Sequence, residues 1–147
     1  MNKPDSIGIA TAADWPEIAA LLAANRLPTA DVDAGRAGEF LVVRDERGVA
    51  GCIGAERRGE CVLLRSLAVR EDSRGRGIGT RLTAEMEARC RAAGAKAAYI
   101  LTETAANFAE GQGYGVVDRL AVPVEIRSTK QFSALCPCCA TCMGKRL

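Results

Sequence analysis

The chain has 147 residues, and its 20 Lys and Arg against 18 Asp and Glu leave a formal net charge of only +2. This length predicts a single domain over residues 1–147, and so small a charge gives no reason to expect nucleic acid or a membrane surface as a partner. The absence of histidine removes the Ser-His-Asp triad, the usual general base and every His-containing zinc site.

The sequence offers no segment that reads as a membrane span or a secretion signal. Acidic residues interrupt the N-terminal segment at Asp5, Asp14 and Glu17, and no apolar run reaches the ~18 residues that a span requires. Seven cysteines, an odd number, favour free or metal-bound thiols in a reducing compartment over a set of disulfides. We therefore expect a cytoplasmic protein.

The first half of the chain predicts a strand, a helix and three further strands. A short strand at 7–11 is followed by Thr11 and Asp14, which are spaced as a capping box. Apolar residues at helical spacing then predict a helix that ends by Pro28, and a polar connection follows over 30–39. The segments expected next are 40–44 (strand), 45–48 (turn), 49–56 (strand), 57–60 (turn) and 61–69 (strand).

A glycine-rich segment, residues 74–79 (RGRGIG), stands between the last of these strands and an amphipathic helical pattern. Glycines let the backbone adopt positive φ and approach a ligand closely, and the N–H groups at a helix start favour a bound diphosphate. Arg74 and Arg76 add positive charge there. The spacing is not the dinucleotide fingerprint, which would need a glycine at Thr80, and no Gly-Lys-Ser/Thr occurs to make a Walker loop. The segment therefore predicts a pyrophosphate cradle.

The second half of the chain predicts a long helix and a second set of strands. Apolar residues at every fourth position from Ile78 to Cys90 form the helix stripe, and Gly94 ends it. Glu85 with Arg89, and Glu87 with Arg91, are expected to form ion pairs on the solvent side. The segments that follow are 97–102 (strand), 104–112 (helix), 116–122 (strand), 123–135 (weakly periodic helix) and 138–143 (strand). This order predicts an α+β, three-layer α/β/α fold in which helices cover both faces of a mixed, mostly antiparallel sheet.

The spacing Arg74-x-x-Gly77-x-Gly79 resembles the [Q/R]-x-x-G-x-[G/A] acyl-CoA loop of the GNAT superfamily of N-acetyltransferases, and the order of elements matches that superfamily. Three longer segments are similar to its arsenic-resistance N-acetyltransferases: 63–69 (LLRSLAV), 101–105 (LTETA) and 126–137 (IRSTKQFSALCP). The last is also similar to the acetyltransferase portion of some N-acetylglutamate synthases.

The resemblance implies a GNAT acyl-CoA N-acyltransferase fold and transfer of acetyl from acetyl-CoA to a small amino-acid-like amine, with an arsenical amine among the candidates. Glutamate or another ordinary amino acid is an alternative acceptor. A different alternative is a non-catalytic protein that binds acyl-CoA or a metalloid. The expected partners are acetyl-CoA and the amine alone, and the chain is expected to be a monomer or a homodimer.

The resemblance also implies the residues of the site. Those expected to contact acetyl-CoA are Leu67, Ala68, Val69, Arg74, Gly75, Arg76, Gly77, Ile78, Gly79, Thr80 and Phe108. Those expected to contact the amine substrate are Arg65, Ser66, Thr102, Thr104 and Arg127. Backbone N–H groups near Leu67 and Val69 would hold the thioester carbonyl and the pantetheine arm, because preorganised dipoles stabilise the oxyanion that forms there.

The catalytic acid and base stay unassigned at this point. GNAT proteins often carry a tyrosine four residues before the glycine of a Gly-Phe or Gly-Tyr pair, but four residues before Gly113 stands Ala109. A thiol with a pKa near ~8.5 is a tolerable leaving group, so a water or a hydroxyl such as that of Ser66 or Thr104 could serve instead. Glu56 and Glu103 are candidate bases, and each is expected to be a surface carboxylate.

Arg65 has two possible roles. By two-residue alternation it lies on the strand face of Leu63 and Leu67. A guanidinium among apolar side chains must reach solvent, a partner or an anion. It either holds a substrate carboxylate or oxyanion in bidentate fashion or extends to a structural carboxylate.

Four cysteines gather near the C-terminal end of the chain: Cys136, Cys138, Cys139 and Cys142. In an extended strand Cys138 and Cys142 would lie ~13 Å apart and Cys139 would point to the opposite face. Zn–S bonds of about 2.3 Å cannot gather thiols so placed. We expect small buried apolar residues here and no bound metal.

Overall fold

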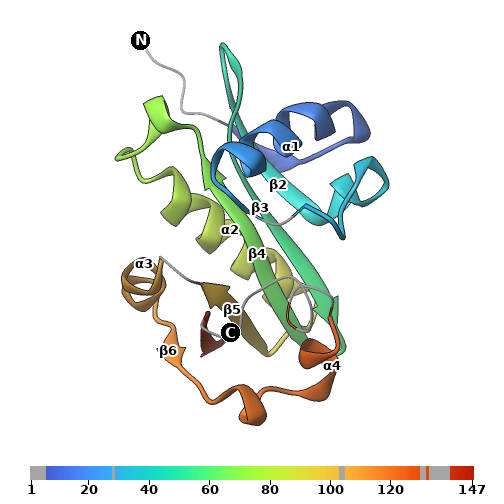
Figure 1. Ribbon diagram of the computed structural model, residues 1–147, viewed down its shortest axis with the longest axis vertical. Helices are drawn as coiled ribbons and strands as arrows, with labels where there is room; N and C mark the ends of the chain where they lie inside the picture. Colours follow the sequence, from blue (N-terminus) through green and yellow to red (C-terminus); the bar gives the residue numbers. More distant parts are fainter. Residues whose placement is uncertain (1–5, 28, 103–104, 130–131, 133–139) are drawn as a thin grey trace. The chain divides into compact units, whose positions relative to one another are not determined.

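The computed structural model describes residues 6–27, 29–102, 105–129, 132 and 140–147. Over these residues the strands form one seven-stranded sheet in the order β1-β2-β3-β4-β5-β7-β6 (Figure 1). Neighbours β1–β2, β2–β3, β5–β7 and β6–β7 are antiparallel, whereas β4 and β5 are parallel. The mixed, mostly antiparallel sheet with its helices confirms the predicted α+β fold class.

The strands are β1 (Ser6–Ile9), β2 (Phe40–Asp45), β3 (Gly48–Arg58), β4 (Cys61–Val69), β5 (Ala97–Thr102), β6 (Gly115–Val116) and β7 (Thr141–Arg146). The α-helices are α1 (Trp15–Ala24), α2 (Ile78–Ala92), α3 (Ala106–Gly111) and α4 (Val124–Arg127). Short 3-10 helices occur at η1 (Ala12–Asp14), η2 (Ala34–Glu39), η3 (Glu71–Ser73) and η4 (Arg119–Ala121).

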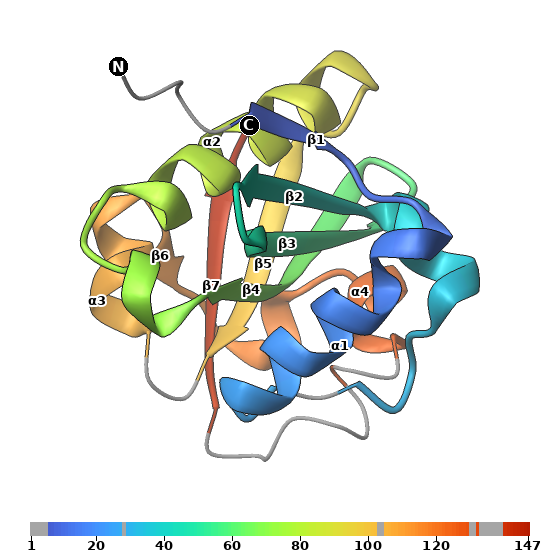
Figure 2. The same cartoon turned by 90° about the horizontal axis from the view of Figure 1, so that it is seen from above.

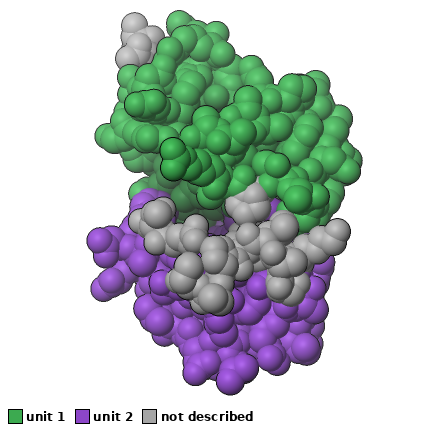
Figure 3. Space-filling view, viewed as in Figure 1, with its two compact units in different colours: residues 1–54, 66–86 green, residues 55–65, 87–147 purple. Residues whose placement is uncertain are grey.

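The chain divides into two compact units (Figure 3). Unit 1 comprises residues 1–54 and 66–86, and unit 2 comprises residues 55–65 and 87–147. Strands β3 and β4 and helix α2 each contribute residues to both units, so the division follows contacts rather than the boundaries of elements. We describe each unit by itself.

In unit 1, strands β1, β2 and the first part of β3 lie side by side (Figure 2), and α1 supplies the apolar side chains that pack against them. The core contains Ile18 and Leu22 of α1 with Phe40 and Val42 of β2. The predicted capping box is present, because the Thr11 N–H donates to Asp14 Oδ2 at 2.8 Å. Burial of this apolar stripe is what holds α1 in place.

In unit 2, strand β5 pairs with β7 along its whole length, from Ala97 opposite Arg146 to Thr102 opposite Thr141. A second core forms around this pair, and its members come from β4, β5, β7 and residues before, within and after α4. They are Leu63, Leu101, Val122, Ile126, Phe132 and Cys142.

Two predicted elements near the C-terminal end are shorter in the structure than expected. The strand predicted at 116–122 is only β6, because the Asp118 side chain accepts a hydrogen bond from the Leu120 N–H (2.8 Å) and turns the chain into η4. The helix predicted at 123–135 is interrupted after α4, where the Thr129 hydroxyl donates to the Ile126 carbonyl (2.8 Å).

Two further predicted elements are present, with bounds that differ by a few residues from the prediction. The helix predicted at 104–112 is α3, which begins later, and the strand predicted at 138–143 is β7, whose described part ends at Arg146 rather than Met143. Residues 133–139 lie outside the described residues.

Candidate functional site

The glycine-rich segment joins η3 to α2 in unit 1 and is exposed along residues 74–77. Gly75 has φ +80° and Gly77 has φ +76°, values that side-chain-bearing residues rarely adopt. A Cβ built on either glycine would meet no atom within 4 Å among the described residues. Glycine is needed here for backbone conformation, and the space beside both glycines is open to a ligand.

Helix α2 begins directly after this loop, and its first turn carries no acidic residue. The Arg81 N–H donates to the Gly77 carbonyl at 3.0 Å, so the helical ladder starts from the loop. The N–H groups of a first turn have no intrahelical acceptor, and the helix dipole makes this end positive. Together with the open loop, this arrangement fits a diphosphate.

Glycine also allows the start of α2 to lie close to β3. A Cβ on Gly51 would stand 2.9 Å from Ile78 Cγ2 and 3.2 Å from Leu82 Cδ1, which is closer than side chains tolerate. Ile78 is therefore a core residue through its side chain, and only its backbone is available for the acyl-CoA contact that the sequence predicts.

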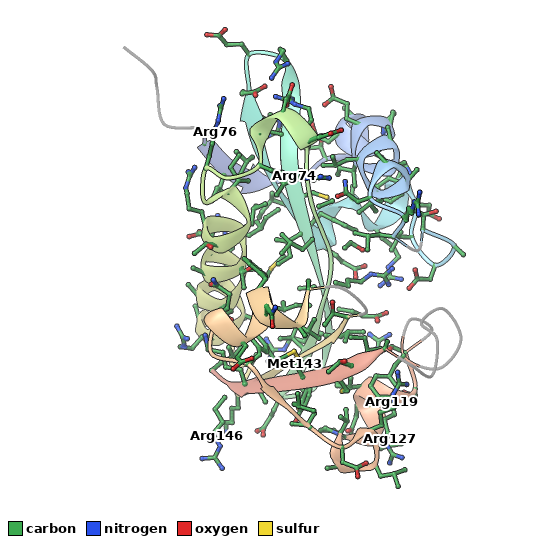
Figure 4. All side chains as sticks on the ribbon, turned by 60° about the vertical axis from the view of Figure 1, so that its left-hand side comes forward. Arg74, Arg76, Arg119, Arg127, Met143 and Arg146 are labelled. Carbon is green, nitrogen blue, oxygen red and sulfur yellow. The ribbon has the colours of Figure 1, made fainter. Side chains whose placement is uncertain are left out.

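The two arginines of the loop differ in their surroundings (Figure 4). Arg74 Nε donates to the Val69 carbonyl at 3.2 Å, and its Nη2 donates to Asn25 Oδ1 at 2.9 Å. Arg74 thus ties the loop to the ends of β4 and α1. Arg76 is exposed and makes no hydrogen bond or ion pair with the described residues, so its charge is the one available to a ligand.

Strand β4 has an irregular backbone at Ser66, a buried residue with φ +58°. Its carbonyl accepts a hydrogen bond from the Cys52 thiol at 3.4 Å. The two-residue alternation used in the sequence prediction therefore stops at Ser66. Beyond it Ala68 is buried while Leu67 and Val69 are half-buried, so only Ala68 has a fully buried side chain.

In the other unit, β4 pairs with β5 only from Cys61 opposite Ala97 to Leu63 opposite Tyr99. Leu64 and Arg65 therefore extend past the ladder, within the described residues of that unit. Where a parallel pair of strands ends early, the backbone N–H groups beyond it need acceptors outside that pair.

The predicted substrate residues of unit 2 lie in different environments. Arg65 is 5% exposed and takes part in an interaction within the protein. The Thr102 hydroxyl accepts a hydrogen bond from the Ala105 N–H at 2.8 Å. Arg127, in α4, is half-buried, and its Nε has no hydrogen-bond partner among the described residues. Phe108 is half-buried on α3, and Thr104 lies outside the described residues.

One of the two candidate bases is buried, contrary to the sequence prediction. Glu56 was expected at the surface, but it is 3% exposed and its Oε1 accepts a hydrogen bond from Arg58 Nη2 at 3.0 Å. An ionised carboxylate so buried needs such a charged partner. Glu103 lies outside the described residues.

A buried polar cluster in unit 2 escaped the sequence analysis. Glu87, predicted on the solvent side of α2, is 6% exposed. Its Oε2 accepts a hydrogen bond from the Tyr114 hydroxyl at 2.7 Å, and its Oε1 accepts one from Lys145 Nζ at 3.0 Å. Burial first, and then the hydrogen bond to Glu87, raise the pKa of Tyr114. A glutamate at a helical position next to the apolar stripe gave only a weak signal for this burial.

The described cysteines behave as small apolar residues. Cys52, Cys90 and Cys142 are buried, and Cys61 is half-buried. Burial raises the pKa of all four thiols, that of Cys52 to about 12. Among the described residues no three His, Cys, Asp or Glu side chains gather as a metal site would require. Cys136, Cys138 and Cys139 lie outside those residues.

Comparison with known proteins identifies what this arrangement is similar to. Residues 36–116, more than half of the chain, match the profile of the acetyltransferase (GNAT) domain. No curated protein sequence gives a significant match. Within the described residues, no helix is both long enough and apolar enough to cross a membrane.

Several solved structures share the fold at low identity. N-acetylglutamate synthase from Neisseria gonorrhoeae, complexed with coenzyme A and N-acetyl-glutamate, is similar with a TM-score of 0.87 at 20% identity over 100% of this chain and 36% of that chain. This chain therefore spans about a third of that enzyme's length.

Rv2747 from Mycobacterium tuberculosis, in complex with CoA and NLQ, has a TM-score of 0.80 at 19% identity over 97% of this chain and 99% of that one. A GNAT-family acetyltransferase from Staphylococcus aureus Mu50 has a TM-score of 0.75 at 15% identity over 98% of this chain and 99% of that one. At such identities these likenesses establish the fold.

Proposed function

Because the chain belongs to the GNAT family of acetyltransferases, and is therefore an acyltransferase, we propose that it transfers acetyl from acetyl-CoA to the amine of a small amino-acid-like substrate. The observation that carries the donor half of this proposal is the exposed loop before α2. Two glycines there have positive φ and open space beside them, at the positive end of a helix whose first turn has no carboxylate.

In the proposed complex the diphosphate of acetyl-CoA lies against residues 75–80 and Arg76 supplies a mobile charge. The guanidinium of Arg74 bonds to Val69 and Asn25. It contributes by fixing the loop and adds positive potential without leaving its partners. The pantetheine arm follows the backbone of residues 67–69, where β4 runs on after Ser66.

The proposed acetyl transfer requires little from side chains. Backbone N–H groups on β4 would stabilise the oxyanion formed when the amine attacks the thioester, and one such donor is worth about 2.7–4 kcal/mol where it has been removed from an enzyme. An α-amino group with a pKa near ~8 needs only about 1.4 kcal/mol to lose its proton at pH 7. Water can accept that proton, which agrees with a chain that has no histidine.

Two similarities support the choice of the amine that accepts the acetyl group. Segments 63–69, 101–105 and 126–137 are similar to the arsenic-resistance N-acetyltransferases, which favours an amino-acid-like amine that includes arsenical analogues. The fold is also that of a glutamate-acetylating enzyme captured with coenzyme A and N-acetyl-glutamate. Glutamate is therefore the second candidate acceptor.

The test is a screen of thiol release from acetyl-CoA with a panel of amines. The panel contains the common amino acids, arsenical amino-acid analogues of the same size, and their amine-blocked forms as controls. We expect turnover with at least one free amine and none with its blocked form. A protein that binds CoA at micromolar concentration but turns over no member of the panel would favour the non-catalytic acyl-CoA-binding alternative.

A further inference from the structure

We propose that Arg70 is a positioning residue for the acetyl-CoA site, and that it fixes the glycine loop by tying η3 to the tip of the β2–β3 hairpin. The hairpin tip is residues 45–48. This inference rests on the proposed function, because the ligand concerned is the diphosphate of acetyl-CoA. All of the residues involved belong to unit 1.

The guanidinium of Arg70 reaches both segments at once. Its Nε donates to Asp72 Oδ1 of η3 at 2.7 Å, and its Nη2 donates to Ser73 Oγ at 3.2 Å. On the other side Nη2 forms an ion pair with Asp45 at the hairpin tip, and Nη1 donates to the Val49 carbonyl at 3.4 Å. A planar fork with several donors can make such a set of bonds, and an ammonium group cannot.

The backbone carries this constraint into the loop. The Arg70 N–H donates to the Ala50 carbonyl at 2.7 Å, and the Ser73 N–H donates back to the Arg70 carbonyl at 2.8 Å. Ser73 is 1% exposed, and Arg74 is the next residue. The glycines at positions 75 and 77 have more conformational freedom than residues with a side chain. The direction of the loop is therefore set at its ends, by η3 on one side and α2 on the other.

Arg70 also compensates negative charge beside the proposed anion site. Asp72 is two residues before the loop, and Asp45 lies on the far side of the same guanidinium. Hydrogen bonds from Arg70 first, and then from Arg47, lower the pKa of Asp72 to about 2, and Arg70 is likewise the main cause of the lowered pKa of Asp45. Both carboxylates stay ionised at neutral pH. Loss of Arg70 removes the side-chain counter-charge of Asp45 and leaves Asp72 paired with Arg47 alone, so less of their repulsion toward an incoming diphosphate is cancelled.

The experiment compares CoA with pantetheine, which lacks the diphosphate together with the phosphorylated adenosine. CoA carries the diphosphate, and pantetheine carries the same arm without any phosphate. Affinities are measured by calorimetry for CoA and by NMR titration for pantetheine. We expect Arg70→Met to weaken CoA binding about tenfold, equivalent to about 1.4 kcal/mol, and to leave pantetheine binding unchanged. Arg70→Lys should recover only part of the loss.

Arg36→Met is the matched control. Arg36 forms a two-pronged ion pair with Glu39, at 2.7 Å for each nitrogen, and donates to the Asp31 carbonyl. Its side chain is 29% exposed against 23% for Arg70, and it lies in η2 of the same unit. This variant should lower the melting temperature comparably and leave CoA affinity unchanged.

Two results would overturn the positioning role: unchanged CoA affinity in Arg70→Met, or equal proportional losses for CoA and pantetheine. If Arg70→Met fails to fold, Arg70→Lys and Asp45→Asn decide in the same way, because each weakens the tie and keeps the shape. A wild-type protein that binds no CoA would instead refute the proposed function.

Discussion

At the scale of single residues, Gly77 tests the acetyl-CoA loop most directly. An L-residue at φ +76° is strained by about 1–2 kcal/mol, and relief of that strain would turn the loop's N–H groups away from the ligand. We expect Gly77→Ala to weaken CoA binding by at least tenfold in calorimetry, with a modest loss of melting temperature.

Gly59 provides the control for this substitution. It has φ +61° in the turn between β3 and β4, and a Cβ there also meets nothing within 4 Å among the described residues. Gly59→Ala carries the same kind of strain in the other unit. It should destabilise the fold to a similar degree and leave CoA affinity intact. Similar CoA losses in both variants would mean that strain alone explains the effect.

A second residue-scale prediction separates the two roles of Arg65. If its guanidinium holds a substrate carboxylate, Arg65→Lys and Arg65→Met should raise KM for the amine and leave KM for acetyl-CoA unchanged. If it pairs with a structural carboxylate, Arg65→Met strands that charge and costs about 3–5 kcal/mol.

Its burial, with an interaction inside the protein, leads us to expect the stability loss. Urea unfolding and steady-state kinetics of the same variants give the answer. A stable Arg65→Met protein with a raised KM for the amine would contradict this expectation.

At the scale of elements, the Glu87 cluster joins Glu87 of α2 to Lys145 of β7 and to Tyr114, which lies shortly after α3. Lys145→Met should leave the buried Glu87 carboxylate without its cation, and we expect a loss of about 3 kcal/mol in urea unfolding, the low end for a buried pair because Lys145 is 25% exposed. Adding Glu87→Gln should restore part of this loss, because the stranded charge is then gone. Additive losses in the double variant would show that the two groups do not interact.

The elements that the sequence predicted well are those with a strong periodic pattern or an obligatory breaker. Strand β5 was predicted with its observed bounds, and α2 was predicted from its stripe and from Gly94, whose φ is +101°. Prediction failed where short polar side chains redirect the backbone. Asp118 and Thr129 each bind a nearby main-chain group, and no hydrophobic period records such a bond.

The residues of the candidate site likewise divide into those that could be predicted from the sequence and those that could not. Its glycines were predictable, because spacing and flanking elements specify the loop. Residues that act through partners distant in sequence could not be predicted. Asp45 was predicted only as a turn residue, yet its side chain binds Arg70, which is 25 positions away. The left-handed backbone at Ser66 also escaped notice, since nothing in an apolar strand pattern marks a serine as irregular.

At the scale of the whole molecule, the ionisable groups predict a broad plateau of stability against pH. With no histidine, the resolved shifts fall at the two extremes. The lowered pKa values of Asp14, Asp45 and Asp72 give stability that is present above the ordinary aspartate pKa of 3.8 and is lost as pH falls below it, for Asp72 toward about 2. The raised pKa of Cys52 gives stability that is present below 9.0 and is lost as pH rises toward about 12.

Melting temperatures measured from pH 2 to 11 should therefore be flat between about 5 and 8.5 and fall on both sides. Asp72→Asn should be less stable than wild type at neutral pH and should lose less on acidification. A melting temperature that changes steeply near pH 6.5 would show that other groups control stability.

The burial of the described cysteines has a practical consequence for enzymology. A thiolate, not a thiol, attacks disulfide and alkylating reagents, so Cys52, Cys90 and Cys142 should remain unmodified while the protein is native and react once urea opens the cores. Mass spectrometry of alkylated peptides would show the contrast. The colour that Ellman's reagent develops during turnover would then owe nothing to these three thiols.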